Sequence, residues 1–304
     1  MANLLDLRRR IKSVKNTQQI TKAMKMLSAV NLRRAQERVT NARPFARKMT
    51  EVLTELAAHT DENYHHPLLD RRGDERYLLV LITSDKGLAG AFNANLIKAA
   101  QTFIRERDAG TVELMAVGRK GRDFFRRRDI EIVQEYIGLT GKGRVSYEEA
   151  AGMASDITRR FIEDEGIDKV FLLYNEFRSV LQQRVVVEQL LPVSRVEEGE
   201  GEGDAAGGDG NAAGAQNFVE YIYEQPPAEI FSRLLPRLIE TQVFRALLES
   251  IASEQGARMT AMDAASKNAG DLIGSLTLNM NRIRQAAITK EIIEVVSGAA
   301  AASS

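Results

Sequence analysis

The hydrophobic residues of the first 60 positions recur mostly at steps of three and four. They are Leu4, Leu7, Ile11, Val14, Ile20, Met24, Leu27, Leu32, Ala35, Val39, Ala42, Met49, Val52 and Leu56. This spacing predicts one long helix over residues 1–60 with a narrow apolar stripe along one side. Pro44 lies inside the pattern and predicts a local bend or a break at that point.

Residues 74–195 show a different pattern, in which short apolar runs alternate with helical stretches. Runs typical of strands occupy 76–83, 112–117, 130–136, 169–177 and 184–191, and helical patterns occupy 93–107, 119–127 and 146–164. Strands that alternate with helices indicate βαβ units. We therefore expect a Rossmann-like α/β domain with a mainly parallel sheet.

The segment 196–216 is rich in glycine, alanine and acidic residues and has almost nothing to bury. This composition predicts a surface linker. The run NFVEYIYE that follows predicts one more strand of the α/β domain within 217–226.

The three- and four-residue spacing returns from Ile230 to Ala287, and no proline follows Pro236. A helix over most of 227–304 would extend roughly 100 Å, and the first helix roughly 80 Å, at 1.5 Å per residue. Neither narrow stripe can be buried by its own helix in water. We therefore predict a long antiparallel coiled coil of the N- and C-terminal helices, with the α/β domain at one end. The predicted fold class is α/β.

Composition and charge limit the kinds of site and partner that the chain can have. The chain has no cysteine, which excludes disulfides, thiolate catalysis and cysteine-based zinc sites. The longest apolar runs are far shorter than a bilayer requires, so we expect no direct insertion into a membrane.

The first 50 residues carry thirteen lysines and arginines against Asp6 and Glu37. Such a run is most often a solvated helix face, but it also fits nucleic acid, anionic lipid or an acidic protein partner. Phe45 is the only aromatic residue in this region, which weakens the case for binding single-stranded nucleic acid through base stacking.

Two further motifs are candidates for ligand binding. Three histidines, His59, His65 and His66, lie near Asp61 and Glu62 in a polar turn, where a solvated role is expected and no metal is assigned. The loop SDKGLAGAFN lacks the spacing of both common phosphate-binding glycine motifs, and GKGR at 141–144 lacks a magnesium-holding hydroxyl. We expect no cofactor.

Two stretches, NTQQITKAMKMLSA at 16–29 and RQAAITKEIIEVVSGAAA at 284–301, resemble the gamma subunit of F-type ATP synthases of the bacterial type. SDKGLAGAFN is similar to the loop after the first strand in that family. The resemblance extends from Ala2 to Ala301, except for the linker, which is an insertion of unknown role.

The resemblance implies a non-catalytic central-stalk rotor. Such a subunit transmits proton-driven rotation of the membrane ring to the catalytic sites of the hexamer, and it regulates ATPase activity and proton flow. The implied partners are the alpha3-beta3 hexamer of F1, the epsilon subunit and the membrane c-ring. One copy per complex is expected, at the cytoplasmic side of the inner membrane as a peripheral protein, without nucleic acid. The cysteine pair of the chloroplast members is absent.

Five positions match family positions implicated in coupling the shaft to the catalytic subunits: Met24, Lys25, Arg258, Gln285 and Thr289. From the pattern alone, Met24 is a residue of the helix seam, and Gln285 and Thr289 are ordinary surface residues. We expect leucine, methionine and alanine inside the seam, and lysine and arginine on the outer face toward the partners.

Two other classes of function remain as alternatives. An α/β enzyme with helical arms would use polar residues at the carboxyl ends of strands, where Asp85, Lys86, Asn93 and Asn95 are the candidates. A coiled-coil adaptor would bind nucleic acid through the basic helix with a steep salt dependence.

Overall fold

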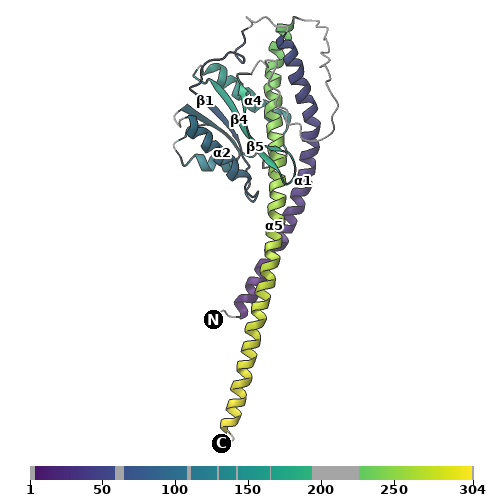
Figure 1. Cartoon of the computed structure of the whole chain (residues 1–304), viewed down its shortest axis with the longest axis vertical. Helices are drawn as coiled ribbons and strands as arrows, with labels where there is room; N and C mark the ends of the chain where they lie inside the picture. Colours follow the sequence, from purple (N-terminus) through teal and green to yellow (C-terminus); the bar gives the residue numbers. More distant parts are fainter. Residues whose placement is uncertain are drawn as a thin grey trace, which may run out of the picture.

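The computed structural model describes residues 4–58, 65–107, 111–128, 130–141, 143–164, 166–193 and 226–302. Two long helices form a shaft, and an α/β domain lies beside one end of it (Figure 1). The predicted linker 196–216, the predicted strand within 217–226 and His59, Asp61 and Glu62 lie outside the described residues.

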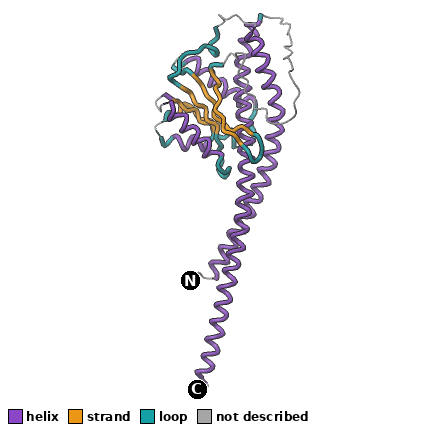
Figure 2. The backbone as a smooth tube through the Cα atoms, viewed as in Figure 1, coloured by secondary structure: helices purple, strands orange, loops and turns teal. Residues whose placement is uncertain are grey.

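The shaft consists of α1 (Leu4–Ala58) and α5 (Pro227–Ala302), which run antiparallel (Figure 2). The predicted fold of an antiparallel helix pair with an α/β domain is confirmed. Of the bend or break predicted at Pro44, a break does not occur, because α1 remains one helix across this residue, as predicted for residues 1–60. Pro44 is exposed, while Ala42 and Met49 pack against the core. Packing on the opposite side of the helix therefore keeps α1 helical at Pro44, where proline removes one backbone hydrogen bond.

The α/β domain contains a five-stranded sheet. Its strands are β1 (Tyr77–Ile82), β2 (Val112–Val117), β3 (Ile132–Tyr136), β4 (Lys169–Phe177) and β5 (Gln183–Leu191), in the order β3-β2-β1-β4-β5. All neighbours pair in parallel except β4 and β5, which are antiparallel. The helices are α2 (Phe92–Arg107), α3 (Arg119–Phe125) and α4 (Tyr147–Glu163). The predicted strands agree with these bounds to within two residues at either end.

The central strand β1 shows how the domain is joined to the shaft. Leu78, Val80 and Ile82 on one face belong to a core shared with α1, α4 and α5, whereas Leu79 and Leu81 on the other face pack with α2. Since β1 is fully buried, both faces of the sheet are covered. The shaft is thus one layer of the domain, which fixes the domain on it.

Candidate functional site

Polar contacts between the two long helices establish their register. Gln18 Nε2 donates to the carbonyl oxygen of Ser266 at 3.2 Å, and Lys25 Nζ lies 2.6 Å from Asp263 Oδ1. Counting outward along antiparallel helices from the Gln18 contact places the start of α1 beside roughly Met280.

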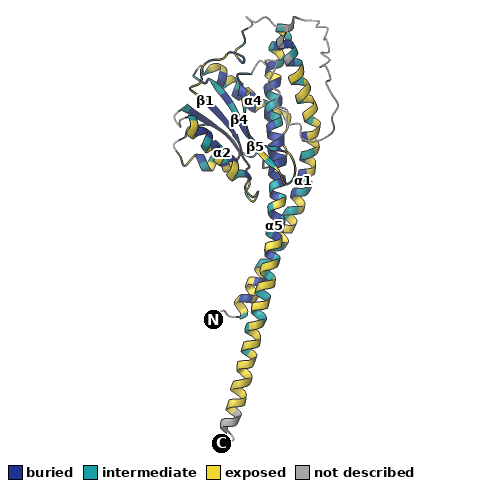
Figure 3. Ribbon diagram, viewed as in Figure 1, coloured by how far each residue is buried: buried dark blue, intermediate teal, exposed yellow. Residues whose placement is uncertain are grey.

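The last part of α5 therefore extends beyond α1 as a single helix, by about 30 Å at 1.5 Å per residue. Figures 1 and 3 show this end, with exposed residues around the helix. Its large exposed apolar side chains are Ile288, Ile292, Ile293, Val295 and Val296. We call this stretch, residues 281–302, the tip.

Gln285 and Thr289, two of the predicted coupling residues, both lie on the tip and are exposed. They are four residues apart, so their side chains share one face of α5. Thr289 Oγ1 donates to the carbonyl oxygen of Gln285 at 3.0 Å, an internal helix contact that leaves the Gln285 amide on the surface.

Lys25 makes a different contact from the one expected. Its ammonium group is hydrogen-bonded to Asp263, which also pairs with Lys267 at 3.0 Å. The hydrogen bonds from Lys25 and then Lys267 hold the pKa of Asp263 below its ordinary value. Lys25 thus joins α1 to α5, although its side chain remains partly exposed. Met24 beside it is half-buried.

The seam around Lys25 contains small polar side chains, which corrects the predicted stripe. Thr21 and Ser28 are buried, whereas Ile20 and Leu27 are 60% and 63% exposed. The buried positions 7, 11, 21, 28, 32, 35 and 39 fit one continuous repeat of three and four, which passes through Thr21 and Ser28, whereas Ile20 and Leu27 each lie one position off it. The outer face of α1 in this region therefore carries apolar residues as well as bases.

Arg258 lies away from the tip, where α5 meets the α/β domain. Its guanidinium pairs with Glu254, and Nη2 donates to the carbonyl oxygen of Gly87 at 3.2 Å. Both side chains of the pair are buried. Burial raises the pKa of the Glu254 carboxyl, and the charge of Arg258 acts in the opposite direction. Arg258 thus holds the loop after β1 on the shaft.

The same loop contains Asp85, at the carboxyl edge of the parallel sheet. This carboxylate accepts hydrogen bonds from the backbone N–H groups of Arg119, Gly138 and Gly141 at 2.7–3.1 Å, and from the Thr140 hydroxyl at 2.9 Å. Burial alone would raise its pKa, but these donors together hold the pKa below the ordinary value. The donors that could bind a phosphate in such a fold are therefore already bound to an internal carboxylate.

Glu249 joins three elements and was not identified from the sequence. Its carboxylate accepts from Arg43 Nε of α1 at 3.0 Å and from the backbone N–H of Phe177 of β4 at 3.0 Å. The residue is only 4% exposed. The sequence feature that could have identified Glu249 is an acidic residue among apolar positions such as Leu248 and Ile251. A charge at such a position is buried only when it is paired.

Membrane-spanning helices and metal-binding clusters are both absent from the described residues. No helix there is long and apolar enough to cross a membrane. Those residues also contain no group of three or more histidine, aspartate or glutamate side chains placed to hold a metal ion.

Comparisons with known proteins point to one family. The family model described as ATP synthase matches residues 3–302. The ATP synthase gamma chain of Solibacter usitatus is 51% identical, over 99% of this chain and 100% of that protein. The gamma chain of Geobacter metallireducens is 50% identical, over 98% of each.

Solved structures agree with the sequence comparison. The central stalk and c-ring structure of the Tetrahymena thermophila mitochondrial ATP synthase contains a chain 25% identical to this one, with a TM-score of 0.59. The match covers 81% of this chain and 99% of that chain. A chain of the Euglena gracilis mitochondrial ATP synthase has the same fold, with a TM-score of 0.67 at 20% identity over 98% and 94% of the two chains.

Proposed function

Because the chain belongs to the ATP synthase gamma-chain family, we infer that it is the central rotor shaft of an F-type ATP synthase and has no catalytic role of its own. It works with the F1 sector and the membrane ring as a peripheral part of a membrane-bound complex. In finer detail, we propose one copy per complex, inside an alpha3-beta3 hexamer and in contact with an epsilon subunit. We place it at the cytoplasmic side of the inner membrane.

The observation that carries this proposal is the tip, a single helix that projects beyond its partner. A shaft that is a helix pair at one level and one off-centre helix at another has no threefold symmetry. Three identical catalytic subunits around it would therefore meet different surfaces at any moment. Differential contact shifts the conformational population of each subunit, so one rotation takes each subunit in turn through nucleotide binding and release.

A rotor also needs a rigid connection between its driven part and its shaft. Glu249 joins α5 to α1 and β4, and the buried pair of Glu254 and Arg258 joins α5 to the loop after β1. Hydrogen-bonded charges inside a packed interface resist sliding, because separating them leaves a buried charge without a partner. We propose that torque passes from the α/β domain to the shaft through these contacts.

The five candidate coupling residues then have distinct roles. Gln285 and Thr289 are positioned to contact the catalytic subunits directly, and Met24 and Lys25 lie on the paired part of the shaft. Arg258 acts at the junction with the domain. The proposed outer surface mixes bases with exposed apolar side chains such as Ile20 and Leu27. Its contacts with the hexamer are expected to be small and dispersed, because a large interlocked surface would hinder rotation.

The decisive experiment is native mass spectrometry of complexes purified through this chain after mild membrane extraction. One copy with three copies each of two nucleotide-binding chains is the expected result. Recovery of the chain alone, as a homo-oligomer or with nucleic acid would contradict the rotor assignment and favour an alternative class.

A further inference from the structure

The polar cluster around Asp85 is built like a ligand-binding site, although its occupant is a side chain of the same chain. The strand order β3-β2-β1-β4-β5 reverses direction at β1, because β2 and β3 lie on one side of it and β4 and β5 on the other. Ligands of open α/β sheets bind outside the carboxyl ends of the strands at such a point. Asp85 follows the end of β1 and lies there.

Each carboxylate oxygen of Asp85 accepts two hydrogen bonds. Oδ1 accepts from the backbone N–H groups of Arg119 at 3.1 Å and Gly138 at 3.0 Å. Oδ2 accepts from the backbone N–H of Gly141 at 2.7 Å and from the Thr140 hydroxyl at 2.9 Å. The four donors come from the connections that follow β2 and β3, so three connections of the domain meet at one anion. Backbone donors that converge in this way form an anion-binding site.

Two glycines adapt the backbone to this anion. Gly138 has a φ of 88°, which lies in the left-handed region that favours glycine. A Cβ atom on Gly141 would lie 3.1 Å from Asp85 Oδ2, so a side chain there would crowd the carboxylate. Glycine that allows the backbone to approach an anion closely is also how related α/β folds bind phosphate groups.

The charge around the cluster is positive apart from the internal carboxylate. Lys86, Arg119 and Lys120 lie on the surrounding connections and are exposed. The internal carboxylate also acts electrostatically on the carboxyl of Glu254, but that group is already paired with Arg258. Removing the internal carboxylate therefore leaves four donors without an acceptor in a positive potential, which an anion from solution can satisfy.

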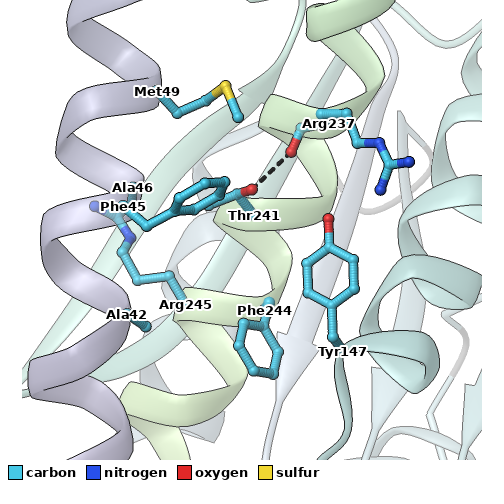
Figure 4. A pocket seen from close by; sticks show the side chains of 9 residues that line it. All are labelled: Ala42, Phe45, Ala46, Met49, Tyr147, Arg237, Thr241, Phe244 and Arg245. Carbon is cyan, nitrogen blue, oxygen red and sulfur yellow. Dashed lines mark hydrogen bonds between the residues drawn. The ribbon is translucent and has the colours of Figure 1, made fainter.

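A groove of about 570 Å³ between α1, α5 and the start of α4 is a second concave surface, but it does not suit a free anion (Figure 4). Its walls are mainly apolar, with Phe45 at the α1 side. The two guanidinium groups in it, Arg237 and Arg245, are already bonded to the carboxylates of Glu240 and Glu188. An anion is therefore expected at the edge of the sheet and not in the groove.

We propose that the connections after β1, β2 and β3 form a binding site for a small carboxylate anion. The side chain of Asp85 fills it in the native chain, and a free anion such as formate fills it when that carboxylate is removed. The four donors are directed at two oxygen positions, which favours a planar carboxylate over a tetrahedral anion. An occupant on the same chain has a high effective concentration, so the native site excludes free anions. The site does not depend on the rotor function, because all its groups belong to the α/β domain.

Formate binding by the full-length chain with Asp85→Ala tests this proposal. The substitution removes the carboxylate and leaves the four donors in place. Saturation-transfer NMR at neutral pH detects bound formate through its proton, and thermal unfolding in sodium formate or in the same concentration of sodium chloride measures the stabilisation. The matched control is Asp85→Asn, whose amide fills the same space without a charge, and the wild-type chain is the second control.

In the Asp85→Ala chain, formate is expected to bind with a dissociation constant on the order of 20 mM. At about 200 mM it should raise the melting temperature by about 3 °C relative to chloride. Wild type and Asp85→Asn are expected to give no formate signal and equal melting temperatures in the two salts. In the Asp85→Ala background, Thr140→Val should weaken formate binding roughly threefold or more, while Thr140→Ser retains it.

Two results would overturn the proposal: no formate signal from the Asp85→Ala chain, or the same signal and stabilisation in Asp85→Asn. Sulfate that stabilises Asp85→Ala more than formate does, after subtraction of its effect on wild type, would contradict the proposed class of anion. If the Asp85→Ala chain does not fold in chloride, it is refolded from urea in both salts. Equal yields of folded chain would then overturn the proposal.

Discussion

The two ends of α5 show one helix under two different physical demands. Beside the α/β domain α5 is almost completely buried, and every residue from 246 to 256 is buried (Figure 3). At the tip, residues 288–298 are all exposed, their isoleucines and valines included. The first region is held in place, and the second presents its surface.

The difference lies mainly in how charge is used. In the buried region Glu249 is bonded to α1 and β4, and Arg258 is bonded both to Glu254 of its own helix and to the loop after β1. At the tip, Lys290 and Glu294 form only a 3.5 Å pair within the helix. Buried charge pairs define a position, because any other arrangement leaves a charge unpaired. Exposed pairs contribute little and permit movement.

The strongest way to break this comparison is to remove the carboxylate that joins three elements. Glu249→Ala leaves Arg43 and the Phe177 N–H without their acceptor, and we expect a loss of about 3 kcal/mol in the free energy of unfolding. Urea unfolding of the full chain measures it. The matched control at the tip, Glu294→Ala, is expected to change stability by less than about 0.5 kcal/mol. Equal losses of stability in the two variants would contradict the proposed difference between the buried region and the tip.

The buried pair of Glu254 and Arg258 tests the same contrast through the dependence of stability on pH. Arg258→Ala leaves Glu254 buried without its cation, so a loss of about 2–4 kcal/mol is expected near pH 8. Burial raises the pKa of Glu254 in the folded protein above the ordinary value of 4.5. The folded state therefore binds a proton at Glu254 more tightly than the unfolded state does. The loss of stability caused by Arg258→Ala should become smaller as the pH falls toward the pKa of Glu254. A loss independent of pH between 5 and 8 would mean that the charge of Glu254 is not its source.

Asp85→Asn examines the carboxyl edge of the sheet. The amide cannot accept from all four donors as a carboxylate does, and a loss of about 2 kcal/mol is expected at pH 7. The pKa of Asp85 is held below 3.8, so its stabilisation is present above that value and is lost as the pH falls through the lower folded pKa. The difference between variant and wild type should therefore disappear in acid. Thermal unfolding from pH 7 down to pH 2.5 measures this, and a difference that grew in acid would contradict it.

Lys25→Glu distinguishes a contact within the shaft from a contact with a partner. The change places like charges at the seam beside Asp263, and we expect fewer protons pumped per ATP hydrolysed in inverted vesicles, with little change in folding. The charge-swapped variant Lys25→Glu with Asp263→Lys restores the pair. Recovery of pumping in the swap would assign the effect to the seam, and a persistent defect would assign it to a surrounding subunit.

The smallest effect on stability is expected at the tip. Gln285→Ala and Thr289→Ala are expected to change the free energy of unfolding by less than about 0.5 kcal/mol, because both residues are exposed. If the tip contacts the catalytic subunits, the same variants lower ATP-driven pumping in proportion to hydrolysis. Ser297→Ala, which removes another exposed hydroxyl of the same helix segment, serves as the control. Unchanged coupling in both variants would exclude these side chains as contacts.

Much of the fold could be predicted because its signals are local. The strands at 112–117 and 169–177 were predicted with the bounds that β2 and β4 have, since a buried parallel strand is a continuous apolar run. The candidate site was harder to predict from the sequence. Gln285 and Thr289 were identified only through a resemblance, while Glu249 and the groove around Phe45 depend on residues that lie far apart in the chain.

The shaft near Thr21 shows why the rest needed the structure. Steps of three and four continued from Leu7 and Ile11 lead to Thr21 and Ser28, which are buried, but apolarity favoured Ile20 and Leu27, which are exposed. The packing against α5 keeps this repeat even where its positions are polar.

The sequence by itself determined that two long amphipathic helices flank an α/β domain, because periodicity and turn residues act over a few positions. The tertiary structure decided the register of the helices, the length of the tip and the role of each buried charge. Those features depend on contacts between residues about 200 positions apart, as in Arg43 with Glu249. Such a contact forms only where the packing of both helices and the sheet is satisfied together.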